Sequence, residues 1–352
     1  TGTAASTRTL VGSTITNSST VNGGGLALTI TGNAVIDGDL SNITNLSISG
    51  TSSIGGNITT TGTQTYTGAV TITGTAATRT LTNTSSAITF SSTVDSTALA
   101  ANSLTFGAGT GTATFTGAVG GASDGALGTI TNASGQTLIF SDAVSATTIA
   151  NYGTLLFNAT AAKTISPAIT DNGTTTVQVI NSANSVAPGV ITFSGNVAAD
   201  TITIGNTTYA GSALFNGTVS GTNINIVGGD HASEASLGKF ANTVSVTAIT
   251  LDTSTGTATA EFSGSSKTVT GTIDGLATTE GIVTASGTTT FASTIGATHR
   301  PAQLTVSGAT TFQDAVQTGA LTTTAAISNG TTLDVSGTSS IGGNITTTGT
   351  QT

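Results

Sequence analysis

Few side chains in this sequence could carry out chemistry, and those few lie far apart. The segment Gly121-Ala-Ser-Asp-Gly125 matches the G-x-S-x-G pattern of serine nucleophiles, which functions on a strand–turn–helix with a histidine partner. Helix formers are scarce throughout the chain, and its two histidines, His231 and His299, are widely separated in the sequence. We therefore interpret the segment as a turn and expect no catalytic triad.

A second group of candidates lies in the most charged segment, residues 228–239. Asp230, His231 and Glu234 could converge on a divalent ion, because imidazole and carboxylate groups are both competent ligands. The alternative is a solvated loop or short turn that projects from the protein core, and it is the interpretation we favour. His299-Arg300-Pro301 is interpreted as another surface loop. We expect no metal and no cofactor.

The remaining charges exclude several classes of function. The 15 carboxylates are spread thinly, with Asp37 and Asp39 as the close pair, whereas glycan-cleaving enzymes need clustered acids. The six basic residues occur singly, so they offer no phosphate-binding cluster for nucleic acid. No continuous apolar run reaches the length of about 18 residues that a membrane helix needs, so we expect no membrane insertion. We predict that the chain is not an enzyme.

Composition predicts an all-β protein. Charged residues make up 6% of the chain, and Thr, Ser, Asn and Gly supply its polarity. Thr, Val and Ile favour strands because their branched side chains pack well on a pleated surface, and Gly and Asn favour turns. The chain has no Cys, so disulfides and zinc–thiolate sites are excluded. A Thr-rich chain that lacks Cys and Met is typical of an exposed extracellular product, and we expect a bacterial source.

A short motif recurs along the chain: an aromatic residue, a spacer, a small residue, a second spacer and then Val. Its fixed period indicates a repeat architecture, in which each unit buries its apolar side against its neighbours. We predict that the motif residues form a ladder in the core. The aromatic members are Tyr66, Phe90, Phe115, Phe140, Phe193, Phe215, Phe240, Phe291 and Phe312. The valine members are Val70, Val94, Val119, Val144, Val197, Val219, Val244 and Val316.

The motif permits two local geometries. In a straight strand, the aromatic, small and valine residues share the inward face; if the small residue forms a corner, the aromatic and valine belong to adjacent strands. Both geometries bury Phe and Val, and stacked coils would lie ~4.8 Å apart. One motif per coil gives a β-solenoid with about 21–25 residues in each coil.

The spacing of the motif divides the chain into three segments. Residues 1–144 and 193–352 are predicted as regular coils, and residues 145–192, which contain Pro167 and Pro188, as irregular coils with loops of the same solenoid. The motif is also incomplete at Phe262, where the position of the final Val is occupied by Ser266. Residues 336–352 repeat residues 49–65 without a change, so we expect a window from a longer, tandemly duplicated protein.

The run from Ile58 to Ile72 resembles the repeats of filamentous-haemagglutinin-type surface proteins. The Phe-x-Gly-x-Val series is also similar to repeats of bacterial autotransporter passengers. This resemblance implies a right-handed parallel β-helix that is exported to the bacterial cell surface, with adhesive or coat-forming roles. It implies no functional residue.

These features together favour a structural role. We expect a non-enzymatic segment of a giant extracellular protein, which forms a rod, filament or stalk by coil stacking and end-to-end continuation. That continuation is either covalent or by head-to-tail docking of the chain with itself, and lateral contacts between copies are a further option. The alternatives are an adhesin that binds a glycan or a host surface, and a surface-layer lattice. Two minor alternatives are an ice-binding solenoid and a polysaccharide-active β-helix enzyme. The first is suggested by Thr59, Thr61 and Thr63, which alternate along one segment.

Overall fold

The chain folds as a stack of parallel strands. A computed structural model describes residues 7–84, 86–109, 111–122, 125–158, 160–182, 189–253, 256–329 and 331–352. Within these ranges all regular secondary structure is β-strand, and no helix is present. The parallel strands form a β-solenoid of about 15 turns, which confirms the predicted fold class.

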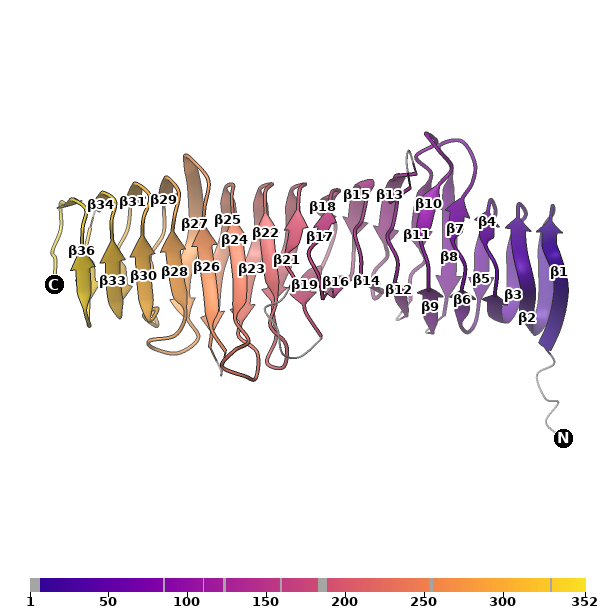
Figure 1. Ribbon diagram of the computed structural model, residues 1–352, viewed down its shortest axis with the longest axis horizontal. Coiled ribbons are helices and arrows are strands. Elements are labelled where there is room, and N and C mark those ends of the chain that lie inside the picture. The colour runs from indigo at the N-terminus through magenta and orange to yellow at the C-terminus, as the bar shows by residue number, and fades with distance from the viewer. Residues whose placement is uncertain are drawn as a thin grey trace. The chain divides into compact units, whose positions relative to one another are not determined.

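The solenoid consists of two compact units. Unit 1 comprises Thr1–Phe157 and Thr164–Thr175, and unit 2 comprises Asn158–Lys163 and Thr176–Thr352. In Figure 1 the strands of unit 1 run from indigo to magenta, and those of unit 2 from pink to yellow. No helix long and apolar enough to cross a membrane occurs in the part of the chain that the structure describes.

Unit 1 is built from short strands joined by tight corners. Its strands are β1 (Thr7–Asn17), β2 (Val21–Ile36), β3 (Leu40–Ile48), β4 (Ser52–Ile54), β5 (Ile58–Thr60), β6 (Gln64–Tyr66), β7 (Val70–Ile72), β8 (Thr78–Asn83), β9 (Ala87–Phe90), β10 (Val94–Ser96), β11 (Ser103–Phe106), β12 (Thr112–Phe115), β13 (Leu127–Asn132), β14 (Thr137–Phe140), β15 (Ala146–Asn151), β16 (Thr154–Asn158), β17 (Lys163–Ile165) and β18 (Ala168–Asp171). The last residue of β16 and the first residue of β17 belong to unit 2.

Unit 2 repeats this construction with several longer strands. Its strands are β19 (Thr176–Ile180), β20 (Ile191–Phe193), β21 (Val197–Ile204), β22 (Ser212–Phe215), β23 (Val219–Val227), β24 (Ser236–Phe240), β25 (Val244–Asp252), β26 (Ala258–Phe262), β27 (Lys267–Gly275), β28 (Ile282–Ala285), β29 (Thr289–Phe291), β30 (Gln303–Val306), β31 (Thr310–Phe312), β32 (Val316–Thr318), β33 (Ala320–Thr323), β34 (Ile327–Asn329), β35 (Leu333–Val335), β36 (Ser339–Ile341) and β37 (Ile345–Thr347).

The recurring motif is a corner. The aromatic residue is the last residue of one strand, as at Tyr66, and the valine is the first of the next, as at Val70. The small residue lies between them, where a Cβ added to Gly68 would be 2.5 Å from the carbonyl carbon of Gly50 in the preceding coil. A bulkier side chain does not fit at this place, because the two backbones approach closely. The structure thus selects the corner from the two geometries that the sequence permits.

In unit 1 the motif residues form two continuous columns. Tyr66, Phe90, Phe115 and Phe140 pair in register, and their rings stack with centroids 4.8–5.0 Å apart. Phe157 extends the stack at 5.5 Å. The second column begins at Val70 and continues through the next motif valines, Val94, Val119 and Val144. Offset stacking of this kind stabilises aromatic pairs beyond the area they bury.

In unit 2 the motif moves from one column to another. Phe193, Phe215 and Phe240 stack in register, and Phe262 continues this column although it lacks the final Val. Phe291 pairs instead with Val269, and Phe312 stacks on Phe291. Both therefore extend the column of Val197, Val219 and Val244, which lies one face further along the coil.

Val316 also lies one face further along the coil than the earlier motif valines of unit 2. It follows Ile273 and Ile295 in the third column of unit 2, which contains isoleucines. The predicted ladder residues of unit 2 therefore occupy three columns, two of which contain aromatic residues, and the motif marks corners rather than one face. All the predicted ladder residues are buried, with exposures of 0% or 1%.

Coil length varies more widely than the motif spacing predicts. Phe90 pairs with Phe115, and this coil falls within the predicted range. Ile36 pairs with Ile54 and Phe140 pairs with Phe157, and both of these coils are shorter than predicted. The strand pairs that contain these residues are continuous in register, so the difference in length lies outside them. In the coil from Ile36 to Ile54, β3 pairs with β2 and with β5 with register shifts. The shortest coils suffice to form every face, and the additional residues of the longer coils form loops.

The segment expected to be irregular contains regular strands. β15, β16, β17, β18 and β19 all lie within residues 145–192, and β15 pairs in register with β13 and β18. Pro167 lies in the connection between β17 and β18, where its missing N–H disrupts no ladder. Pro188 is outside the described residues.

Candidate functional site

The three candidate metal ligands, Asp230, His231 and Glu234, do not converge. They lie in the connection between β23 and β24, where His231 Nε2 is 3.8 Å from Asp230 Oδ1 and both side chains face solvent, 65% and 46% exposed. Glu234 is 6% exposed, and its carboxylate lies against the backbone of Gly229. Its backbone closes the turn, since its N–H donates to His231 O at 2.9 Å. Among the described residues no group of three or more acids, histidines or cysteines could hold a metal ion.

The other sequence candidates occupy corners and turns. Asp37 and Asp39 lie in the connection between β2 and β3, and the Asp39 carboxylate accepts a hydrogen bond from the backbone N–H of Asn57 at 2.7 Å. Gly125 N–H donates to Ala122 O at 3.0 Å. Ser123 and Asp124 of the G-x-S-x-G segment are outside the described residues.

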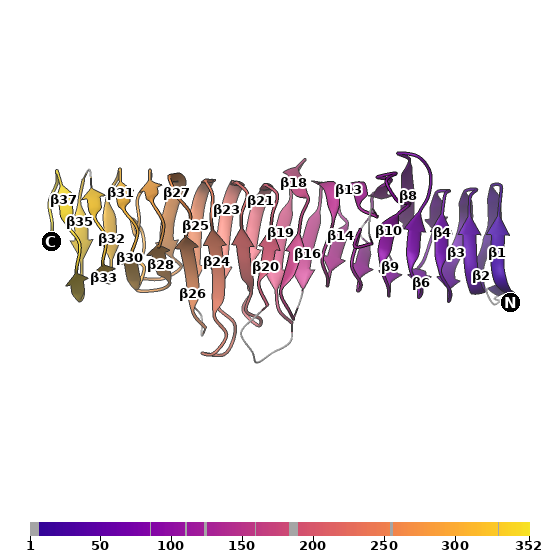
Figure 2. The ribbon, with the colours of Figure 1, turned by 45° about the horizontal axis from the view of Figure 1, so that its top comes forward.

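Three long connections of unit 2 lie at one corner of its coils. Residues 205–211, 228–235 and 276–281 each join a strand of the isoleucine column to a strand of the aromatic column. The strands of both columns pair from coil to coil, so the first two connections lie in adjacent coils and the third lies two coils further along the same corner. Ser236 Oγ at the end of the second loop accepts a hydrogen bond from Gly211 N–H at 3.0 Å. Figure 2 shows connections of this region extending beyond the strand ends.

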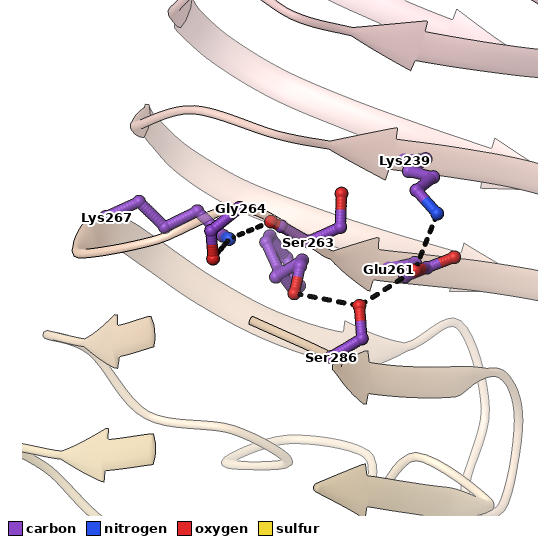
Figure 3. Close-up of polar contacts among 7 residues, drawn as sticks. Lys239, Glu261, Ser263, Gly264, Lys267 and Ser286 are labelled. Carbon is purple, nitrogen blue, oxygen red and sulfur yellow. Dashed lines mark hydrogen bonds and ion pairs between the residues drawn. The ribbon is translucent and has the colours of Figure 1, made fainter. Parts of the chain in front are cut away.

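A charged network crosses three turns of unit 2 (Figure 3). Lys239 Nζ lies 2.9 Å from Glu261 Oε1, and Ser286 Oγ donates to the same oxygen at 2.8 Å. Lys239 and Glu261 are in-register neighbours on β24 and β26, and both side chains are partly exposed. This network was not predicted from the sequence, because its partners are distant along the chain. One feature of the sequence does indicate the pairing. Lys239 and Glu261 directly precede Phe240 and Phe262, which are neighbours in the aromatic column.

Lys267 forms a second polar centre beside this network (Figure 3). The residue is 3% exposed, and its ammonium group donates to Ser263 O at 2.7 Å and to Gly264 O at 3.0 Å. Burial lowers the pKa of the amine to about 8, although the charge of Glu261 acts in the opposite direction. The contacts of the amine are backbone carbonyls of one turn, so its geometry supports a structural role at the corner.

The predicted His299 loop is held by the carboxylates of Asp274 and Asp334. Asp274 Oδ1 accepts hydrogen bonds from the N–H groups of Thr298 at 2.9 Å and His299 at 3.2 Å. Arg300 forms an ion pair with Asp334 of β35. These contacts are within unit 2 and attach the connection 296–302 to the neighbouring coils.

Apolar side chains line two cavities of the described chain. Beside β1, which pairs with β2, lies a cavity of about 250 Å³ lined by residues that include Leu10, Ile15 and Leu28. Beside β36 and β37 lies a cavity of about 190 Å³ lined by residues that include Ile341 and Ile345. Neither lining contains an acidic side chain or a histidine.

Comparison with protein-family models, with curated proteins and with solved structures finds no match to this chain.

Proposed function

We propose that the chain is a non-enzymatic structural segment of a large extracellular bacterial surface protein, in which solenoid coils continue end to end as a rod, filament or stalk. The observation that carries this proposal is the recurrence of one coil in both units. Residues 49–65 and 336–352 are identical, and β36 and β37 have the same bounds within the repeat as β4 and β5. A segment that can occupy either place is suited to an array that continues.

Chemistry and composition support a structural role. The charged groups that do meet, such as Lys239 and Glu261, pair with each other or with backbone atoms. With 6% charged residues the chain presents little like-charge repulsion between neighbouring copies. The resemblance of the repeats to filamentous-haemagglutinin-type and autotransporter-passenger proteins supports the same assignment, including the bacterial cell surface.

Electron micrographs of the material as its host produces it would test the proposal. We expect uniform filaments or stalks whose diffraction shows an axial spacing of ~4.8 Å, the distance between stacked strands. Compact monomers that cleave a polysaccharide would contradict it. Filaments joined side by side in a sheet would support the surface-layer alternative.

An adhesin is a second candidate, and one observation favours it. The connections 205–211, 228–235 and 276–281 of unit 2 lie along one corner, and Leu276 in the last of them is 55% exposed. Loops that a rigid scaffold holds side by side are frequent sites of recognition. A glycan array probed with the full chain, and with a variant in which residues 229–234 are shortened, would separate the two functions. Binding that is lost in the variant supports an adhesin, whereas no binding by either supports a stalk.

A further inference from the structure

One outward face of unit 2 combines large aliphatic side chains with the ion pair of Lys239 and Glu261. Its strands β22, β24, β26 and β28 pair in register from coil to coil. On β24, Leu237 and Lys239 point outward, in alternation with the buried residues of that strand. By the same alternation Leu214 points outward on β22 and Ile282 on β28, and both are half-buried. We call these five residues the ion-pair face.

Large aliphatic side chains distinguish the ion-pair face from the neighbouring isoleucine column. Two outward rows of that column run along β21, β23, β25 and β27. Their members are Thr201, Asn223, Ala248 and Thr272 in one row, and Thr203, Asn225, Thr250 and Asp274 in the other. Leucine and isoleucine at outward positions, beside charged and polar groups, are typical of a surface that contacts another protein.

The two charges of the ion-pair face can each bind a further partner. Lys239 Nζ lies 2.9 Å from Glu261 Oε1, yet the two side chains are 37% and 21% exposed (Figure 3). An ammonium group has three donors, and a carboxylate has about four acceptor sites. Lys239 and Ser286 both contact the same carboxylate oxygen. Both charged groups therefore retain the capacity to bind an opposite charge on a second molecule.

We propose that the ion-pair face binds the same face of a second copy of the chain, about a two-fold axis that runs parallel to the strands between β24 and β26. This rotation places Lys239 of one copy opposite Glu261 of the partner copy, and the reverse, because the two residues are in-register neighbours on either side of the axis. The face is thus complementary to itself in charge, which is the requirement for a two-fold interface. The coils of the two copies run in opposite directions.

The same rotation packs aliphatic side chains against short ones. Leu237 and Thr259 are in-register neighbours on either side of the axis, so Leu237 of one copy meets Thr259 of the other. Leu214 lies opposite Thr284 for the same reason. An exposed ion pair contributes little affinity by itself. Burial of the aliphatic groups therefore supplies the affinity, and the charges fix the orientation.

Charge reversal tests the pairing, measured by sedimentation of the full chain at low salt. We expect the unaltered chain to form dimers as its concentration rises. Lys239→Glu and Glu261→Lys should each weaken dimerisation at least about tenfold, because like charges then face each other twice across the axis. An equimolar mixture of the two variants should restore dimerisation, since one copy then presents two glutamates and the other two lysines.

The mixture separates a lost contact from a damaged fold, because any destabilisation of either variant persists in the mixture. The double variant Lys239→Glu/Glu261→Lys exchanges the charges and should dimerise as the unaltered chain does. Leu237→Thr should weaken dimerisation several-fold, since it removes an aliphatic contact on each side of the axis. Thr203→Glu is the matched control, because it adds a negative charge on the isoleucine column, and it should leave dimerisation unchanged.

Four results would overturn the proposal. They are single charge variants that dimerise as well as the unaltered chain, a mixture that dimerises no better than either variant, an equal loss in Thr203→Glu, and a chain that is monomeric at every concentration. The inference concerns the sides of the solenoid and does not depend on end-to-end continuation. Rods that continue end to end but never pair side by side would therefore overturn it and leave the proposed function standing.

Discussion

Phe115 shows what single residues contribute to this fold. Its ring lies between those of Phe90 and Phe140, at 4.8 and 4.9 Å, and meets Phe106 edge-on at 5.6 Å. In a solenoid each coil is buried by its neighbours, so a core side chain contributes to three coils at once.

We predict that Phe115→Ala lowers the free energy of unfolding by about 3–5 kcal/mol, because it leaves a cavity between two stacked rings. Urea unfolding followed by circular dichroism measures the loss. Tyr152→Ala, at an aromatic residue that is 40% exposed, is the control and should change stability by less than about 0.5 kcal/mol. Equal losses in the two variants would contradict the assignment of the aromatic column to the core.

Lys267 gives stability a pH dependence. Its pKa is about 8 in the folded chain and near the ordinary 10.5 when unfolded. Between these values the unfolded chain binds more protons, so the free energy of unfolding rises with pH. Above about pH 10 the trend reverses, since burial raises the pKa of Tyr66 and the unfolded tyrosine ionises first.

We predict a rise on the order of 1 kcal/mol between about pH 8 and pH 9.5, after allowance for solvent screening. Denaturant titrations at the two pH values measure it. Lys267→Met should abolish the rise, and Lys163→Met, at the start of β17, should retain it. A rise that persists in Lys267→Met would show that another group titrates.

At the scale of elements, the corner is the unit that repeats. The chain turns where a small residue lets two coils approach, and Gly68 lies over Gly50 in this way. Coil length is adjusted in the connections, so strands stay in register both in the short coil from Phe140 to Phe157 and in the longer coil from Phe90 to Phe115.

We predict that Gly68→Ala destabilises unit 1 by about 1–3 kcal/mol. The added Cβ would lie 2.5 Å from the carbonyl carbon and oxygen of Gly50 and 2.8 Å from Thr51 N, which are backbone atoms that cannot move aside cheaply. Thermal unfolding measures the effect. Thr65→Ala, on the outward face of β6, should cost less than about 1 kcal/mol. A neutral Gly68→Ala would contradict the close approach of the corners.

The exchange of aromatic and aliphatic residues between neighbouring columns also belongs to the scale of elements. Phe291 and Phe312 occupy places that valines hold in earlier coils, and Ala285 and Val306 occupy places that phenylalanines held. An interior column accepts an aromatic or an aliphatic side chain as long as the facing columns adjust their volume. The motif therefore predicts burial and corners without fixing the face.

At the scale of the whole molecule, ladders hold the coils together while exposed connections leave the chain open to cleavage. Leu99 and Leu276 are 84% and 55% exposed, in the connections 97–102 and 276–281. The strands on both sides of each connection pair with other coils.

We predict that brief chymotrypsin treatment cuts first after Leu99 and Leu276, and that the fragments still elute together in native gel filtration. Denaturing gels and mass spectrometry identify the cuts, and Leu99→Ala and Leu276→Ala should remove them one at a time. First cuts after the buried phenylalanines, such as Phe115 or Phe240, would contradict the fold.

The sequence by itself determined the fold class and the burial of the motif residues. Strand propensity and a regular motif are local properties, and a solenoid is stabilised by contacts between equivalent positions of neighbouring coils. For the same reason it correctly predicted burial for Tyr66 and the motif phenylalanines. The tertiary structure decided that the motif is a corner, that Phe291 and Phe312 change column, and that Lys239 meets Glu261. These depend on register, because a connection longer or shorter by a few residues changes which side chains lie opposite each other without altering the local pattern.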